Sequence, residues 1–236
     1  MSEPDVTVML FAYPNRALTI EQRHAQVMER MVKVPPPLGF EGGVLPPAPS
    51  CGDALSAGYQ IKMSTKGLLC FGDYRYRGER YVYEDKASFD ERITYGFRHT
   101  NKKIDYSLLV HENLPLVIEA FGAYRARISP YYHSMNYQDG EDRDNSPYDR
   151  LVAQGIDVDG RGNIFTLYPA QFLGEKLCQR ALGYGPDEVM RRLSGKIPRV
   201  QPVLDGVYLV FNDDLNLTQE DFNAINDTYK PILGLS

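Results

Sequence analysis

The sequence contains no tryptophan, no long hydrophobic run and only three cysteines, and these absences exclude several classes of protein. No segment approaches the roughly 18 apolar residues that a membrane-spanning helix needs. Cys51, Cys70 and Cys178 are odd in number, far apart and without CxxC spacing. This pattern is typical of reduced, buried thiols in a cytoplasmic protein, and it argues against a disulfide framework or a zinc site.

The motifs of common catalytic and nucleotide-binding sites are also absent. The chain has no GxSxG, SxxK, HExxH or GxxxxGK[ST] sequence, and no GxGxxG follows a predicted strand. His24 falls on an apolar helical stripe, where we expect a hydrogen-bonded core residue. Scattered carboxylates can still meet in space, so a small hydrolase-type enzyme remains an alternative. We predict no enzymatic activity, no catalytic residue, no metal site and no cofactor.

The stretch IDVDGRGN imitates the start of a calcium-binding loop, with Asp157, Asp159 and Gly162 at the first, third and sixth positions. The twelfth position is Tyr168, where the loop requires a bidentate carboxylate, and the fifth is Arg161. We therefore predict a tight turn here and not a calcium site.

Charge is distributed unevenly along the chain. The 236 residues carry a formal net charge of −5, yet residues 139–160 hold seven acids and two bases, and residues 205–229 hold six acids and no base. The rest of the chain is therefore +6. An acidic face of this kind suits a basic partner, although solvated charge runs also occur in proteins without one.

The pattern of apolar residues predicts a single α+β (mixed α/β) domain over residues 1–236, with helices packed on a central, mostly antiparallel sheet that includes one hairpin. Strands are expected at residues 6–13, 57–63, 68–77, 80–84, 163–168 and 206–211. Helices are expected over residues 114–128, 170–182 and 185–195, and after the capping boxes Thr19/Gln22, Ser88/Glu91 and Thr218/Asp221. A loop rich in proline and glycine (34–53) and an acidic loop (131–160) connect these elements.

The stretch DYRYRGERYVYED (73–85) alternates tyrosine with arginine around a single glycine, which suits a two-residue hairpin turn. Such a hairpin places Tyr74 and Tyr76 on one face of their strand. Arg75 and Arg77 then share the other face, so half burial explains the alternation without a ligand. Arginine and tyrosine also suit phosphates and bases, which keeps a nucleic-acid-binding adaptor as an alternative. The net negative charge disfavours it.

Three segments resemble a known family over most of the chain. They are LFAYPNRALTIEQRHAQVMERMVKV (10–34), LPLVIEAFGAYRARI (114–128) and the run from NIFTLY (163–168) to VFNDD (210–214). They are similar to the immunity proteins of bacterial polymorphic toxins and type VI secretion effectors, in particular the immunity protein 52 family. The resemblance implies a small α+β cytoplasmic protein without enzymatic activity, which binds and neutralises a toxin encoded beside it, often a nuclease. It supplies no catalytic residue and no toxin-contacting position.

Candidate contacts with such a toxin follow from charge and loops alone. The N-terminal MSEPDVTVMLFAYPN lacks the positively charged region of a signal peptide, so we expect the two proteins to meet in the cytoplasm. Surface acids speed the encounter with a basic cleft, such as the phosphate channel of a nuclease. We expect no nucleic-acid or membrane partner. The predicted partner-binding residues are Asp139, Glu141, Asp142, Asp144, Asp213, Asp214, Tyr74, Arg75, Tyr76 and Arg77.

Overall fold

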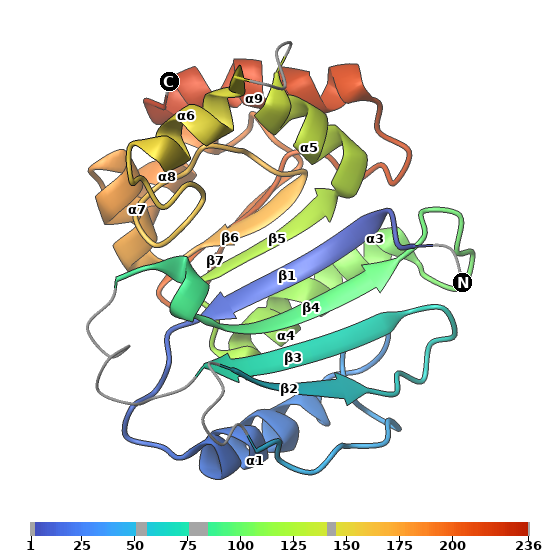
Figure 1. The fold of residues 1–236 in the computed structure, drawn as a ribbon. Coiled ribbons are helices and arrows are strands. Elements are labelled where there is room, and N and C mark those ends of the chain that lie inside the picture. Colours follow the sequence, from blue (N-terminus) through green and yellow to red (C-terminus); the bar gives the residue numbers. More distant parts are fainter. Residues whose placement is uncertain (1–2, 51–55, 76–84, 141–144, 236) are drawn as a thin grey trace. The chain divides into compact units, whose positions relative to one another are not determined.

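The computed structural model of the chain describes residues 3–50, 56–75, 85–140 and 145–235. The chain divides into two compact units, residues 1–123 and 124–236, and each holds four antiparallel strands with helices against them (Figure 1). The predicted α+β class with antiparallel strands is confirmed. The division into two units leaves the single domain over residues 1–236 a prediction.

Unit 1 has the strand order β2-β3-β4-β1, and each neighbouring pair is antiparallel. Val8 and Leu10 lie opposite Tyr95 and Ile93 across the β1–β4 ladder, and all four are fully buried. The strands are β1 (Val6–Ala12), β2 (Ser56–Ile61), β3 (Leu69–Arg75) and β4 (Glu91–Phe97). The helices are α1 (Ile20–Met31), α3 (Tyr106–Leu108) and α4 (Leu114–Phe121), with a 3-10 turn at Ala87–Phe89 and a π-helical segment at Leu109–Asn113.

Unit 2 has the strand order β5-β6-β8-β7, again with antiparallel neighbours. Its helices α5, α6 and α9 lie side by side in Figure 1, and α5 contacts both of the others. The strands are β5 (Arg125–Pro130), β6 (Ala170–Leu173), β7 (Arg199–Val203) and β8 (Gly206–Val210). The helices are α5 (Tyr131–Asp139), α6 (Pro147–Ala153), α7 (Glu175–Leu182), α8 (Pro186–Leu193) and α9 (Gln219–Leu233).

Elements with strong local signals form where they were predicted: β1, α1, α8, β8 and α9. At the start of α1, Thr19 Oγ1 accepts a hydrogen bond from the amide of Gln22, whose side chain accepts one from the amide of Thr19. Thr218 and Asp221 make the same reciprocal pair before α9. Capping boxes satisfy amides that the first helical turn leaves unpaired, so here the local rule and the fold agree.

The segment after Ser88 is the strand β4 and not the predicted helix. Its apolar residues Ile93, Tyr95 and Phe97 are buried, which is the period of two of a strand. Ladders on both sides, with β1 and with β3, supply hydrogen bonds along most of its backbone. These tertiary contacts outweigh the apparent capping box.

The helix predicted over 114–128 is wrong in its second half. α4 ends at Phe121 because Gly122 adopts a left-handed conformation with φ 72°, and strand β5 begins at Arg125. Glycine takes this conformation without the steric cost of a side chain, which makes it a common helix terminator.

The acidic region after residue 130 contains two helices instead of an irregular loop. α5 follows Pro130 directly, and α6 begins at Pro147 after Ser146, whose Oγ accepts a hydrogen bond from the amide of Asp149 at 2.9 Å. The start of α6 therefore has an ordinary capping residue, which the prediction of an acidic loop overlooked.

Residues 163–168 form no strand, which corrects another prediction. Their amides bond to side chains instead: Leu167 N donates to Asn226 Oδ1 at 2.8 Å, and Tyr168 N donates to Gln171 Oε1 at 3.3 Å. The following segment, predicted as one helix over 170–182, is strand β6 and then helix α7. Strand β7 was not predicted, and it forms a hairpin with β8.

The predicted strands 57–63 and 68–77 correspond to β2 and β3, which pair with each other. The predicted turn at Gly78 and the strand 80–84 lie outside the described residues.

Candidate functional site

The structure describes Tyr74 from the predicted tyrosine- and arginine-rich hairpin, and it places this residue in the core of unit 1. Tyr74 is fully buried, and its ring stacks on that of Tyr59 at 5.1 Å between centroids. Its hydroxyl lies 3.1 Å from Nδ1 of His24, whose Nε2 lies 2.9 Å from the carbonyl oxygen of Pro46. His24 is thus a hydrogen-bonded core residue, as predicted. Tyr74 has no surface to offer a partner, and that part of the predicted contact set is corrected.

Arg75, the next residue, is half-buried. Its Nε lies 3.2 Å from Asp73 Oδ1 and donates to the carbonyl oxygen of Asp90 at 3.3 Å. The guanidinium of Arg75 therefore has partners within its own unit. Tyr76 and Arg77 lie outside the described residues.

Three of the six predicted acids are described, and all three lie in unit 2. Asp139 is half-buried at the C-terminal end of α5, where the helix dipole disfavours a negative charge. Asp213 and Asp214 are exposed in the segment that leads into α9. The other three, Glu141, Asp142 and Asp144, lie outside the described residues.

Helix α5 exposes large apolar side chains that the sequence reading missed. Tyr131, Tyr132 and Met135 are 43%, 62% and 39% exposed, and the two tyrosine rings contact each other edge to face at 5.4 Å. The helix also buries little, since Ser134 is its one buried residue among those described. Tyrosine and methionine are enriched in protein interfaces, so an aromatic group of this kind on a helix indicates a contact surface.

Hydrogen bonds join this helix to the start of α9, into which the segment with Asp213 and Asp214 leads. Gln219, at the start of α9, donates from Nε2 to the carbonyl oxygen of His133 at 3.2 Å. Its Oε1 accepts a hydrogen bond from Asn136 Nδ2 at 3.2 Å and lies 3.1 Å from His133 Nδ1. The start of α9 is therefore fixed against α5. We call the set Tyr131, Tyr132, Met135, Asp139, Asp213 and Asp214 the α5 surface.

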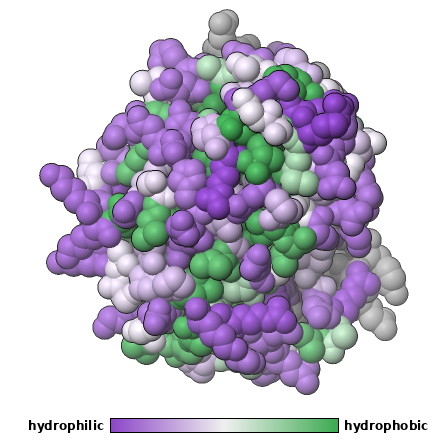
Figure 2. Space-filling model, turned by 180° about the vertical axis from the view of Figure 1, so that it is seen from behind, coloured by the Kyte–Doolittle hydropathy of each residue, from purple (hydrophilic) through white to green (hydrophobic). Residues whose placement is uncertain are grey.

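Elsewhere, exposed apolar residues are more dispersed. Figure 2, which views the molecule from behind, shows hydrophobic residues in small groups between hydrophilic ones. Single exposed apolar side chains are normal for a globular protein. Three of the ten large exposed apolar residues recorded in the described part of the chain lie within the first five residues of α5. This concentration distinguishes α5 from the other elements.

A buried carboxylate organises the turn that the calcium-like stretch forms. Asp159 adopts a left-handed conformation with φ 53°. Its Oδ1 accepts hydrogen bonds from Arg125 Nη2 at 3.0 Å and from the amides of Phe165 and Thr166 at 2.9 and 3.1 Å. Its Oδ2 lies 3.7 Å from Arg127 Nη1. The carboxylate thus faces guanidinium groups and amides, and the tight turn predicted for this stretch is confirmed.

The electrostatics of this network favour an ionised Asp159. Burial alone raises the pKa of its carboxyl, but the charges of Arg125 and Arg127 and the amide hydrogen bonds lower that pKa more, so the net shift is downward. Burial raises the pKa of the neighbouring Tyr168, whose hydroxyl lies 3.3 Å from Asp159 Oδ2, to about 12. At neutral pH the network is a paired carboxylate with a neutral phenol, which suits a structural role.

Two of the three cysteines are buried free thiols, as predicted. Burial raises the pKa of both Cys70 and Cys178, the latter to about 12, so neither is a reactive thiolate at neutral pH. Cys51 lies outside the described residues. In the part of the chain that the structure describes, no three His, Cys, Asp or Glu side chains gather as metal ligands. No helix in that part is both long and apolar enough to cross a membrane.

Comparison with known proteins gives little guidance. No protein-family model matches the chain, and no curated protein does. Among solved structures, a Pseudomonas aeruginosa T6SS protein is similar, with a TM-score of 0.48 and 11% sequence identity over 96% of this chain and 76% of that chain. A likeness this distant does not identify a family or a function, so membership of the immunity protein 52 family stays a prediction.

Proposed function

We propose that this chain is an immunity protein, which binds a toxin delivered by a type VI secretion system and neutralises it without catalysing a reaction. The toxin is a protein encoded beside it, and the binding site on this chain is the α5 surface. In this proposal the toxin is a nuclease and the two proteins meet in the cytoplasm.

The observation that carries the proposal is the exposure of Tyr131, Tyr132 and Met135 beside an acidic segment. Binding energy in protein complexes concentrates in a few large side chains that become fully desolvated, and tyrosine is among the most frequent of these. Rim charges mainly guide the encounter and set its specificity. The α5 surface combines both elements within one unit.

The negative charge of the α5 surface favours a partner with a basic surface. Asp139, Asp213 and Asp214 suit a basic surface, and a cleft that binds nucleic acid must be basic to hold phosphates. The acids of the α5 surface compete with the phosphate backbone for that cleft. Occlusion of the cleft then explains neutralisation without any chemistry on this chain.

The surface is held rigidly enough for tight binding. Ser134 Oγ lies 2.8 Å from Ser129 Oγ on β5, and Gln219 ties the other side of α5 to α9. A preformed helix loses little conformational freedom on binding, which favours affinity. A stable complex of this kind buries about 1,200–2,000 Å² of total surface.

The test is co-expression with the product of the adjacent gene in a host that this product kills. The proposal predicts that the wild-type chain restores growth and co-purifies with the toxin. A variant with Tyr131, Tyr132 and Met135 all replaced by Ala should fold but fail in both respects. A matched variant with the exposed residues Phe71, Leu108 and Leu116 of unit 1 replaced by Ala should still protect.

Each alternative makes a different prediction in the same experiments. A hydrolase-type enzyme needs no complex with the neighbouring product, and its activity would be lost on substitution of a convergent set of polar residues. A nucleic-acid-binding adaptor would bind DNA or RNA with strong dependence on salt. Growth rescue without a complex, or a complex with nucleic acid alone, would reject the proposal.

A further inference from the structure

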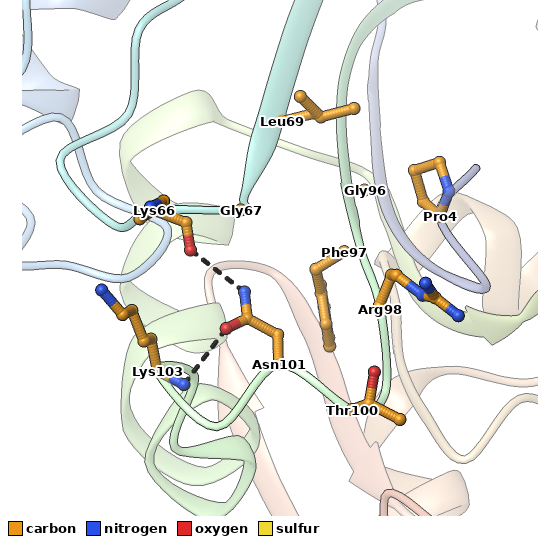
Figure 3. Close-up of a pocket in the computed structure, with 10 residues that line it drawn as sticks. All are labelled: Pro4, Lys66, Gly67, Leu69, Gly96, Phe97, Arg98, Thr100, Asn101 and Lys103. Atoms are coloured by element: carbon orange, nitrogen blue, oxygen red, sulfur yellow. Dashed lines mark hydrogen bonds between the residues drawn. The ribbon is translucent and has the colours of Figure 1, made fainter. Parts of the chain in front are cut away.

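Unit 1 contains a cavity of about 390 Å³ beside the start of β3 and the end of β4 (Figure 3). Leu69 and Phe97 provide apolar lining. The cationic residues Lys66, Arg98 and Lys103 line it as well, and no acidic residue is among the described residues that do so. In Figure 3, Lys66 and Lys103 lie on one side of Asn101, and Arg98 lies on the other side, beyond Phe97. We call this cavity the basic pocket.

Asn101 holds the two lysine-bearing loops together. Its Nδ2 donates to the carbonyl oxygen of Lys66 at 3.1 Å, and its Oδ1 accepts from the amide of Lys103 at 3.1 Å (Figure 3). Glycine at position 67 is required by the same arrangement: its φ is +84°, and a Cβ there would lie 2.8 Å from Asn101 Nδ2. The backbone around the basic pocket is therefore fixed by specific contacts.

The loops that line the basic pocket carry a strong local positive charge. The segments KMSTK (62–66) and RHTNKK (98–103) contain five Lys or Arg and no Asp or Glu, in a chain whose net charge is −5. The nearby Asp5 is already engaged, because its carboxylate accepts from the amide of His99 at 2.7 Å and lies 2.6 Å from the ring nitrogen Nδ1. A concave, partly apolar surface that three cationic residues line has the features of an anion-binding site.

We propose that the basic pocket binds a small phosphate monoester. The phosphate dianion lies between Lys66 and Lys103, and the organic part of the ligand contacts Leu69 and Phe97. Two or more cations suit a dianion better than a monovalent carboxylate, and lysine is a common phosphate ligand. The proposal goes beyond toxin binding, since a basic pocket repels the basic cleft that the α5 surface would contact.

The test is a titration of the full ¹⁵N-labelled chain, followed by amide chemical shifts. The probes are phenyl phosphate, inorganic phosphate and the uncharged phenol. Phenyl phosphate should bind about tenfold more tightly than either of the others, which corresponds to about 1.4 kcal/mol. The shifts should concentrate on residues 66–69 and 96–103.

Substitution separates the basic pocket from general electrostatic attraction. Lys66→Gln and Lys103→Gln keep the side-chain stem and remove the charge, and each should weaken phenyl phosphate about tenfold or more. Lys33→Gln removes one charge from an exposed lysine just after the end of α1 and should leave the affinity unchanged. An unperturbed amide spectrum outside the basic pocket verifies the fold of each variant.

Several results would overturn the proposal. They are equal binding of phenol and phenyl phosphate, equal losses in Lys33→Gln and Lys66→Gln, and no shifts at millimolar phenyl phosphate. Binding of an oligonucleotide without any binding of phenyl phosphate would assign the basic pocket to nucleic acid instead. None of these measurements involves the toxin, so they are independent of the proposed function.

Discussion

The carboxylate of Asp159 and the guanidinium of Arg125 form an ion pair at 3.0 Å inside unit 2, with side-chain exposures of 4% and 2%. Arg125 also donates from Nη1 to the carbonyl oxygens of Gly160 at 3.0 Å and Asn163 at 3.2 Å. One arginine on β5 therefore fixes a turn more than thirty residues later in the sequence.

Replacing Asp159 by Asn should destabilise the protein strongly. The substitution leaves the buried guanidinium of Arg125 without its counter-charge, which typically lowers the free energy of unfolding by about 3–5 kcal/mol. Asp205→Asn makes the same charge change at an exposed turn between β7 and β8, and it should alter that free energy by less than about 0.5 kcal/mol. Urea unfolding measures both. Equal values for the two variants would contradict a structural role for the pair.

The same pair predicts a dependence of stability on pH. The pKa of Asp159 in the folded state lies below its ordinary value of 3.8, so the ionised form stabilises the fold. Its contribution is complete above the unfolded-state pKa and is lost as the pH falls through the folded-state pKa. The difference in unfolding free energy between wild type and Asp159→Asn should therefore shrink only below about pH 4. A difference that widens in acid would have the wrong sign.

Truncation of two neighbouring residues on β3 should lower the stability by very different amounts. Tyr74→Ala removes a fully buried ring and its hydrogen bond with His24, and it should cost about 3–5 kcal/mol of unfolding free energy. Arg75→Ala removes a half-buried ion pair with Asp73 and a hydrogen bond to the carbonyl oxygen of Asp90, and it should cost about 1–2 kcal/mol. Chemical denaturation of both variants checks the contrast. Similar costs would mean that Tyr74 does not pack as the structure describes.

The exposed rings of α5 should matter for binding and not for folding. Tyr132→Ala should weaken the complex with the toxin by about 2 kcal/mol, roughly a thirtyfold loss of affinity. Its free energy of unfolding should stay within about 0.5 kcal/mol of the wild-type value, because the side chain is 62% exposed. Phe71→Ala, at an exposed position on β3, is the matched control. Calorimetric titration gives the affinities, and an equal loss in both variants would remove Tyr132 from the interface.

Charge reversal tests the acids of the α5 surface. Changing Asp139, Asp213 and Asp214 together to Lys should slow association with a basic toxin and reduce the dependence of that rate on salt. Stopped-flow measurements at several ionic strengths give both quantities. The control reverses the exposed acids Glu29, Glu41 and Glu112 of unit 1, which changes the net charge equally. Identical association rates for the two variants would show that only total charge matters.

The sequence correctly predicted helices whose first turn is stabilised by residues close by in the chain. The capping boxes at Thr19 and Thr218 and the Gly185-Pro186 start of α8 each satisfy or pre-organise a helix end within a few residues, and all three helices form there. The capping-box pattern at Ser88 failed because the partners of β4 come from distant strands. Pairing between strands is a non-local interaction, which a short window of sequence does not contain.

The candidate site was harder to predict for the same reason. Charge counting found Asp213 and Asp214, which are indeed exposed, but it treated α5 as part of an acidic loop. The aromatic residues Tyr131 and Tyr132 became visible as a surface only when the helix and its exposure were known. The sequence feature that could have revealed them is the stretch directly after Pro130, which has helical length but no apolar stripe that a core would bury.

The most direct test of the account is the dissociation constant between the purified chain and the product of the adjacent gene, for wild type and for the Tyr132→Ala variant. The account predicts a complex with a dissociation constant in the nanomolar range or below, and a loss of about thirtyfold in the variant. Absence of binding by the wild-type chain would contradict the immunity function. Tight binding that Tyr132→Ala leaves unchanged would contradict the assignment of the α5 surface as the site of contact.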